Sequence, residues 1–177
     1  MTFHIIFGTT LAAILIHLVF TRTEPFTPGR IVEVFLLYLL CIQWGFGAAS
    51  LAIPHILWSD QVAEFIGWTA GSPFQVELGF ASLGLALVGI LCIWIRGWFW
   101  LAPVIGQTVF LLGAAYVHIQ DIALHDNLSP GNAGSVLFYD IAMPLVGCAL
   151  FFLHYRFGGI PSSAGNQVSQ PKTLTVT

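Results

Sequence analysis

The stretch PFQVELGFASLGLALVGILCIWI, at residues 73–95, decides the fold class of this chain. Glu77 is its one charged side chain. At about 1.5 Å of rise per residue, the stretch is long enough to cross about 30 Å of hydrocarbon as a helix. Similar apolar stretches lie at residues 3–20, 31–57, 99–118 and 136–155. We therefore expect an all-α fold, a polytopic transmembrane helical bundle with five spans.

The composition excludes a water-soluble protein. Of the 177 residues, 57% are hydrophobic and 7% are charged, and the mean hydropathy is +0.88. A soluble domain carries about 25% charged residues. Five Lys and Arg against eight Asp and Glu give a net charge of −3, which argues against a nucleic-acid partner. This composition predicts that the chain is surrounded by membrane lipid.

The basic residues predict the orientation. Arg22 and Arg30 lie between the first two spans, Arg96 lies between the third and fourth, and Arg156 and Lys172 follow the fifth. Because cytoplasmic loops are rich in Lys and Arg, this places the N-terminus outside and the C-terminus in the cytoplasm. We expect a multi-pass protein of the bacterial cytoplasmic (inner) membrane. Its transmembrane domain would cover residues 1–157, and residues 158–177 would form a polar cytoplasmic tail.

The connection before the third span carries two local signals. Residues 60–68 mix acidic and apolar side chains, which predicts a short amphipathic helix lying on the outer interface. Ser72, Pro73 and Gln75 then match a capping box that opens the third span. This box places Glu77 one helical turn into the span.

Six ionisable residues are expected at a similar depth in the outer leaflet, and one of them is His55 at the outer end of the second span. His118, Asp121 and His125 follow the spacing i, i+3 and i+7, which gives one polar face at the end of the fourth span. Asp140 lies about one turn into the fifth span. A carboxylate at bilayer depth costs on the order of 2.5–3.5 kcal/mol on insertion scales. We therefore expect Glu77, His118 and Asp140 to face one another inside the bundle, with Asp121 and His125 at the rim.

Three interpretations of this polar cluster remain open, and the first is favoured. Interhelical hydrogen bonds would make it a structural network. A divalent metal such as zinc, iron or manganese could be held by His118, Asp121, His125 and Glu77, although the spacing matches no strong metal signature. The third interpretation is a site for a proton or a small solute.

Other polar residues inside the spans are isolated. Gln43 and Gln107 lie in mid-span and predict hydrogen bonds between helices. His17 is a lone histidine in the first span. It is either hydrogen-bonded within the bundle or an axial ligand to a haem or chlorin.

The motif GWTAGSPFQVELGFA at residues 67–81, followed by His118, PGNAG at residues 130–134 and Asp140-Ile141, gives a family resemblance. Over residues 60–145 the chain resembles a bacterial family of small multi-span integral membrane proteins of unknown function. The resemblance implies that Glu77, His118, Asn132 and Asp140 belong to a shared pattern. It implies no reaction.

Three functions are compatible with these observations. The favoured one is an accessory or structural subunit of a larger membrane complex, for example a respiratory or photosynthetic one, with other membrane subunits or a second copy as partners. The second is a small membrane enzyme or metal-binding protein that uses the polar cluster. The third is a proton-coupled transporter or channel that works as an oligomer. The sequence contains no nucleotide-binding loop and no Cys-x-x-Cys pair, so catalysis is the less favoured class.

Overall fold

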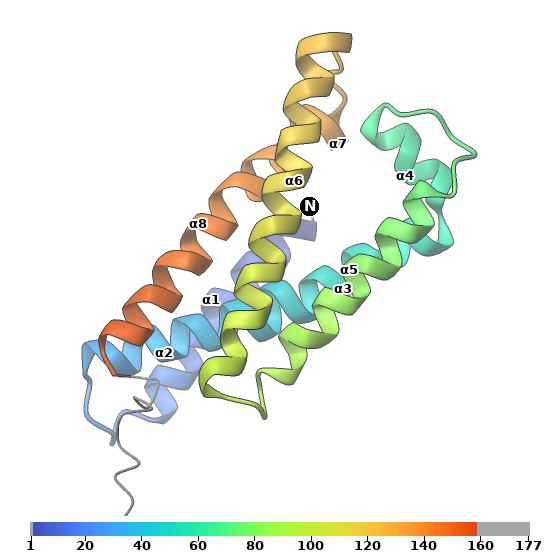
Figure 1. Ribbon diagram of the computed structural model, residues 1–177. Coiled ribbons are helices and arrows are strands. Elements are labelled where there is room, and N and C mark those ends of the chain that lie inside the picture. Colours follow the sequence, from blue (N-terminus) through green and yellow to red (C-terminus); the bar gives the residue numbers. More distant parts are fainter. Residues whose placement is uncertain (1, 159–177) are drawn as a thin grey trace, which may run out of the picture.

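The computed structural model describes residues 2–158, with side chains from residue 4 onward. This part of the chain is helical and contains no strand (Figure 1). The helices are α1 (Thr2–Phe20), α2 (Pro28–Tyr38), η1 (Leu39–Gly47), α3 (Ala48–Leu57), α4 (Ser59–Ile66), α5 (Phe74–Leu91), η2 (Gly97–Trp100), α6 (Leu101–His125), α7 (Pro130–Ala133) and α8 (Ser135–Arg156). Lys172 lies outside the described residues.

Four helical stretches of the described chain are long and apolar enough to cross a membrane. They are Pro28–Leu57, Phe74–Leu91, Gly97–His125 and Pro130–Arg156. The first of them joins α2, η1 and α3, and η1 is a π-helix rather than an α-helix. The apolar part of α1, His4–Phe20, is shorter. The all-helical, membrane-compatible fold is therefore confirmed.

The bundle has two arms that separate toward one end (Figure 1). In one arm α3 packs along α5, and in the other α6 packs along α8. The arms meet around a core that includes Leu40, Trp44, Trp100 and Met143. Polar groups also join the helices there, since the Gln107 amide donates to the Trp44 carbonyl over 3.4 Å.

The prediction that Gln43 and Gln107 bond between helices is confirmed. Gln43 accepts a hydrogen bond from the Thr10 hydroxyl of α1 over 3.1 Å, and its amide donates to the Tyr139 hydroxyl of α8 over 3.4 Å. Gln43 is buried, so these bonds satisfy an amide that would otherwise be costly at this depth. The bond from Thr10 holds α1 against η1, and the bond to Tyr139 holds η1 against α8.

Small residues allow the close helix contacts of the core. A Cβ atom added to Gly89 would lie 2.7 Å from the Leu40 carbonyl oxygen and 3.1 Å from the Gly45 nitrogen, so α5 crosses η1 backbone to backbone. A Cβ atom added to Gly147 would lie 2.0 Å from Cη2 of Trp44. The Trp44 ring thus occupies the space that a side chain at position 147 would need.

The short helix α4 is amphipathic. Ala63 and Ile66 are buried, while Glu64 and Phe65 are exposed. The helix ends at Ile66. The next residue, Gly67, has a φ of 86°, the left-handed conformation that glycine adopts without strain. This turn directs the chain from α4 toward Trp68 and the end of α6.

Candidate functional site

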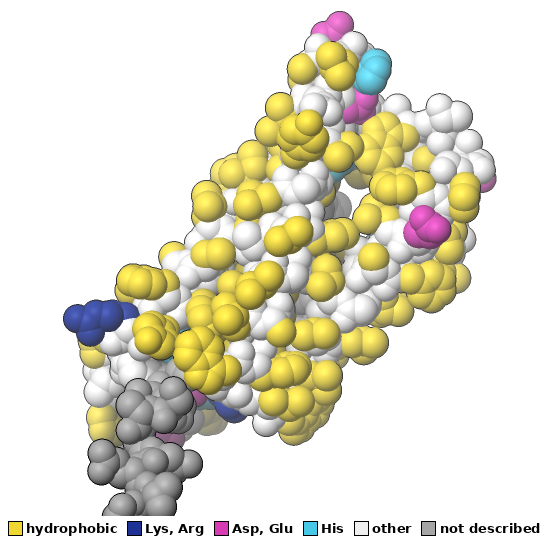
Figure 2. All heavy atoms as spheres, in the orientation of Figure 1, with side chains coloured by type: hydrophobic (Ala, Val, Ile, Leu, Met, Phe, Trp, Pro, Cys, Tyr) yellow, Lys and Arg dark blue, Asp and Glu magenta, His cyan; other side chains and the backbone are white. Residues whose placement is uncertain are grey.

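A cavity of about 600 Å³ lies between the two arms. We call it the interhelical cavity. Figure 2 shows the hollow between the arms, with hydrophobic side chains on both sides of it. Its walls come from η1, α3, α4 and α5 on one side and from α6, α7 and α8 on the other. Most of the lining is apolar, and the polar side chains that reach it are His55, Trp68, Ser82, Gln107, His118, Tyr139 and Asp140.

Asn132 fixes the hydrogen position on His118. The Asn132 amide nitrogen donates to the carbonyl oxygens of His118, over 3.3 Å, and of Asn127, over 2.8 Å. Its Oδ1 atom is therefore the acceptor that lies 2.6 Å from Nδ1 of His118. Nδ1 must carry a hydrogen, and in the neutral ring Nε2 then has a free lone pair.

The Nε2 atom of His118 lies 3.7 Å from Oδ2 of Asp140. Both side chains are buried, with relative exposures of 8% and 7%, and both line the interhelical cavity. A distance of 3.7 Å is too long for a direct hydrogen bond. A third group beside the two side chains can hydrogen-bond to both of them. Depending on its protonation, the pair presents either a donor or an acceptor to the cavity.

Trp68 connects this pair with a second polar group at the end of α6. Its ring is stacked on His118, with 5.9 Å between ring centres and 24° between planes. Its Nε1–H donates to Oδ2 of Asp121 over 2.8 Å. Asp121 also accepts from the Asn127 amide over 2.6 Å and lies 2.8 Å from Nδ1 of His125. Asp121 is therefore the anchor that ties the α4–α5 connection to α6.

The start of α5 differs from its predicted form. The helix begins at Phe74, and the Ser72 hydroxyl accepts a hydrogen bond from the Phe74 amide over 3.2 Å. The reciprocal half of the capping box is absent among the described contacts. Oε1 of Gln75 instead lies 2.8 Å from Nδ1 of His55, which lines the interhelical cavity. The amide that was expected to cap α5 therefore joins α5 to α3.

The structure divides the five predicted site residues into three groups. His118 and Asp140 meet at the interhelical cavity, while Asp121 and His125 pair beyond it toward the end of α6. Glu77 is exposed on α5 and is not part of the cavity lining. The expected meeting of Glu77 with His118 and Asp140 does not occur.

The four residues named for a metal do not converge. Within the described residues, no group of three or more His, Cys, Asp and Glu side chains has metal-binding geometry. Asp121 and His125 pair with each other, but His118 contacts Asp140 instead and Glu77 is exposed on α5. His17 lies elsewhere, with its Nδ1 atom 3.1 Å from the Tyr38 hydroxyl and the two rings at 88°.

Three important side chains were missing from the predicted cluster, namely Trp68, Gln75 and Asn127. His55 was expected at the depth of the cluster, but its contact with Gln75 was not expected. Asn132 was named through the family resemblance alone. It is fully buried although it lies in the turn-forming sequence PGNAG. The sequence signal that could have identified Asn132 is its position in the connection between two spans, one carrying His118 and the other Asp140.

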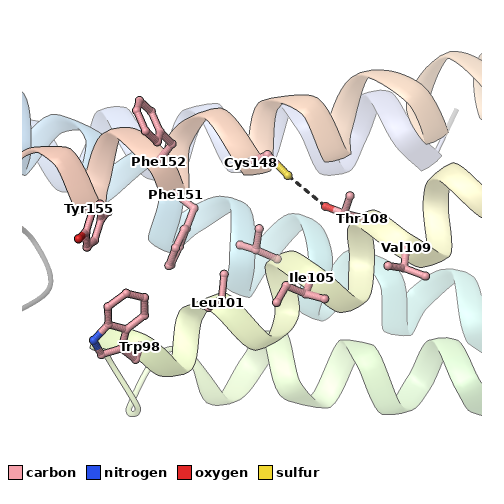
Figure 3. Close-up of a pocket in the computed structure, with 10 residues that line it drawn as sticks. Trp98, Leu101, Ile105, Thr108, Val109, Cys148, Phe151, Phe152 and Tyr155 are labelled. Carbon is pink, nitrogen blue, oxygen red and sulfur yellow. Dashed lines mark hydrogen bonds between the residues drawn. The ribbon is translucent and has the colours of Figure 1, made fainter.

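A second hollow, of about 420 Å³, lies between α6 and α8. Figure 3 shows Trp98, Leu101 and Ile105 on one side of it and Phe151 and Tyr155 on the other. Thr108 and Cys148 make a polar contact there over 3.4 Å. This hollow lacks the buried ionisable pair of the interhelical cavity, so the latter is the candidate site.

The described helical stretches are compatible with a membrane protein, and they enclose a polar pair in a mostly apolar pocket. The chain belongs to a family of unknown function, DUF6790, whose model matches residues 1–159. The family thus extends over more of the chain than the motif-based resemblance. Comparison with curated proteins and with solved structures gave no match.

Proposed function

We propose that this chain is an integral membrane protein that binds an amphipathic small molecule in the interhelical cavity. The observation that carries the proposal is the position of the buried His118–Asp140 pair in a cavity with mostly apolar walls. Ligand sites are concave, mostly apolar and supplied with a few polar groups that orient the ligand. The apolar walls suit the body of the molecule, and the pair suits its polar head.

The exposure of the lining residues supports entry from the hydrocarbon. Val109 and Val117 on α6 are 69% and 44% exposed, and Phe65 and Phe74 on the other arm are 56% and 47% exposed. All four also line the interhelical cavity. A mouth lined by exposed apolar side chains admits a lipophilic molecule from a bilayer without desolvating polar groups.

Five spans with an outside N-terminus remain our proposal for the topology. The contacts of Thr10 with Gln43 and of His17 with Tyr38 support a first span that runs along the second. The ion pair of Arg96 with Glu33, at 3.3 Å, supports a common basic end for α2 and α5. We assign that end to the cytoplasm.

The accessory-subunit function favoured by the sequence becomes the second proposal. Large apolar side chains are exposed on most of the helices. Such a surface suits lipid, another membrane subunit or a second copy equally well. A buried ionisable pair in a cavity is more specific, because helix packing alone does not need it.

The test uses a variant that narrows the interhelical cavity. Gly113 lines it, and a Cβ atom added there would meet nothing within 4 Å, so the backbone has room for the first atom of a leucine side chain. Gly84→Leu is the matched control, since Gly84 is equally free and lies outside the cavity lining. We expect native mass spectrometry of the purified protein to detect a retained small molecule in the wild type and Gly84→Leu. Equal retention by Gly113→Leu would contradict the proposal.

A further inference from the structure

We infer that the molecule bound in the interhelical cavity carries a planar ring with oxygen substituents, of the quinone or quinol class, on an apolar tail. This inference rests on the proposed function and names its ligand class. It follows from three properties of the interhelical cavity: the hydrogen positions on its polar pair, the aromatic side chains of its walls, and the lack of Lys and Arg in its described lining.

The first property is the variable hydrogen bonding of the polar pair. The Asn132 contact occupies Nδ1 of His118, so only Nε2 is available to a ligand. Nε2 and the Asp140 carboxylate are both acceptors when neither holds an extra proton, and one becomes a donor when a proton is added. A quinone oxygen needs a donor, and a quinol hydroxyl needs an acceptor. The His118–Asp140 pair can supply either.

The second property is the aromatic lining. Six aromatic side chains reach the interhelical cavity, namely Trp44, Phe65, Trp68, Phe74, Phe110 and Tyr139. Aromatic rings pack favourably in stacked and edge-to-face arrangements. Trp68 already stacks on His118, so a flat ring beside His118 would meet the edge or face of that indole. A saturated head group would gain less from these walls.

The third property is the charge around the pair. The described basic residues Arg22, Arg30, Arg96 and Arg156 belong to the chain segments at the opposite ends of the spans from His118 and Asp140. None of them forms an ion pair with Asp140 among the described contacts. The described lining of the interhelical cavity therefore contains no Lys or Arg for a phosphate or a carboxylate head group. A neutral oxygen-bearing ring fits this environment better than an anionic lipid.

The test is a binding titration of the full-length protein in detergent, followed by native mass spectrometry. The probe is a benzoquinone with a decyl chain, and the control compound is decylbenzene, which has the same tail and ring shape without oxygen. We expect the quinone to bind the wild type and Gly84→Leu, and decylbenzene to bind at least about ten-fold more weakly. One hydrogen bond to a charged or ionisable group accounts for such a ratio.

Two variants locate the binding. Gly113→Leu should weaken it by at least about ten-fold, because the added side chain takes up space at the wall of the cavity and leaves the polar pair intact. His118→Phe keeps an aromatic ring beside Trp68 and removes Nε2, so it should weaken quinone binding by about ten-fold and leave decylbenzene unchanged.

The outcomes separate the two proposals. Equal binding of decylbenzene and the quinone would overturn the inference about the ring oxygens. Binding of decylamine in preference to the quinone would overturn it as well, because it would show that Asp140 takes a cationic head. In both cases loss of binding in Gly113→Leu would still support an amphiphile in the interhelical cavity. Quinone binding that Gly113→Leu leaves unchanged would overturn the inference about the site.

Discussion

The indole of Trp68 lies against the imidazole of His118, with 5.9 Å between ring centres and 24° between planes. The same indole donates its N–H to Asp121, one turn further along α6. One side chain from the α4–α5 connection thus contacts two polar residues of α6. This contact sets how far α4 stands from the other arm, and therefore the width of the interhelical cavity at that end.

Replacing Trp68 with Phe should loosen α4 while keeping an aromatic ring on His118. The variant loses the hydrogen bond to Asp121, and a bond to a charged group contributes about 1.5–3 kcal/mol. We expect amide hydrogen exchange in Ser59–Ile66 to become at least about ten-fold faster. Trp58→Phe is the control, because Trp58 is 52% exposed. Unchanged exchange in Trp68→Phe would show that Asp121 does not hold this arm.

Replacing Asn132 with Leu should destabilise the protein. Asn132 is fully buried, and its amide contacts the His118 ring and two backbone carbonyl oxygens. Removing the amide takes the acceptor from the His118 ring and a donor from the Asn127 carbonyl, while the His118 carbonyl stays within the hydrogen-bonded helix α6, and each lost bond costs about 1–3 kcal/mol. We expect a clear fall in the thermal midpoint in detergent. Asn132→Asp keeps the acceptor for His118 Nδ1 and loses the two donors, so its midpoint should be intermediate. A wild-type midpoint for Asn132→Leu would refute this role.

Replacing Gly147 with Ala should disturb the contact of α8 with η1. The new methyl group would overlap the Trp44 ring, and overpacking of this kind costs about 1–3 kcal/mol. Gly84→Ala is the matched control, because a Cβ atom there meets nothing within 4 Å. Unfolding in mixed micelles of increasing sodium dodecyl sulfate content would measure the difference. Equal unfolding curves for the two variants would contradict this packing.

Cysteine labelling in whole cells tests the proposed topology. In a variant without native cysteines, we place single cysteines at His4, Thr23 and Thr69, which flank the first two spans. Five spans with an outside N-terminus predict that an impermeant maleimide labels positions 4 and 69 from outside and spares position 23. If positions 4 and 23 behave alike, α1 does not cross the membrane. If position 23 alone is labelled, the orientation is reversed.

The helical class was predictable, because it follows from the length and spacing of apolar stretches. The direction in which a side chain points was less predictable. Glu77 was placed one turn into α5, but on an α-helix it lies about 100° around the axis from the middle of the face formed by Phe74, Leu78 and Ser82. That face lines the interhelical cavity, so Glu77 does not. Depth alone could not exclude it.

The predicted common face of His118, Asp121 and His125 shows the same limit. The three residues share one side of α6, yet His118 faces Asn132 and Asp140 while Asp121 faces Trp68 and Asn127. Partners from loops decided which carboxylate each histidine meets. Asn127 lies in a loop and Asn132 in the four-residue helix α7, and neither segment has an apolar period. Their direction is therefore set by tertiary contacts that a hydropathy pattern does not encode.

The direction of the side chains in the second span depends on the π-helix η1. Its backbone bonds join residues five apart, so each turn holds more residues than an α-turn. If Leu39–Gly47 became α-helical with all nine residues kept, everything after it would rotate by about 100°. Ala52, which faces α5, and His55, which pairs with Gln75, would then point elsewhere. The π-helical segment thus sets the rotation of α3 relative to α2, so that the two parts of this span each face their own neighbouring helices.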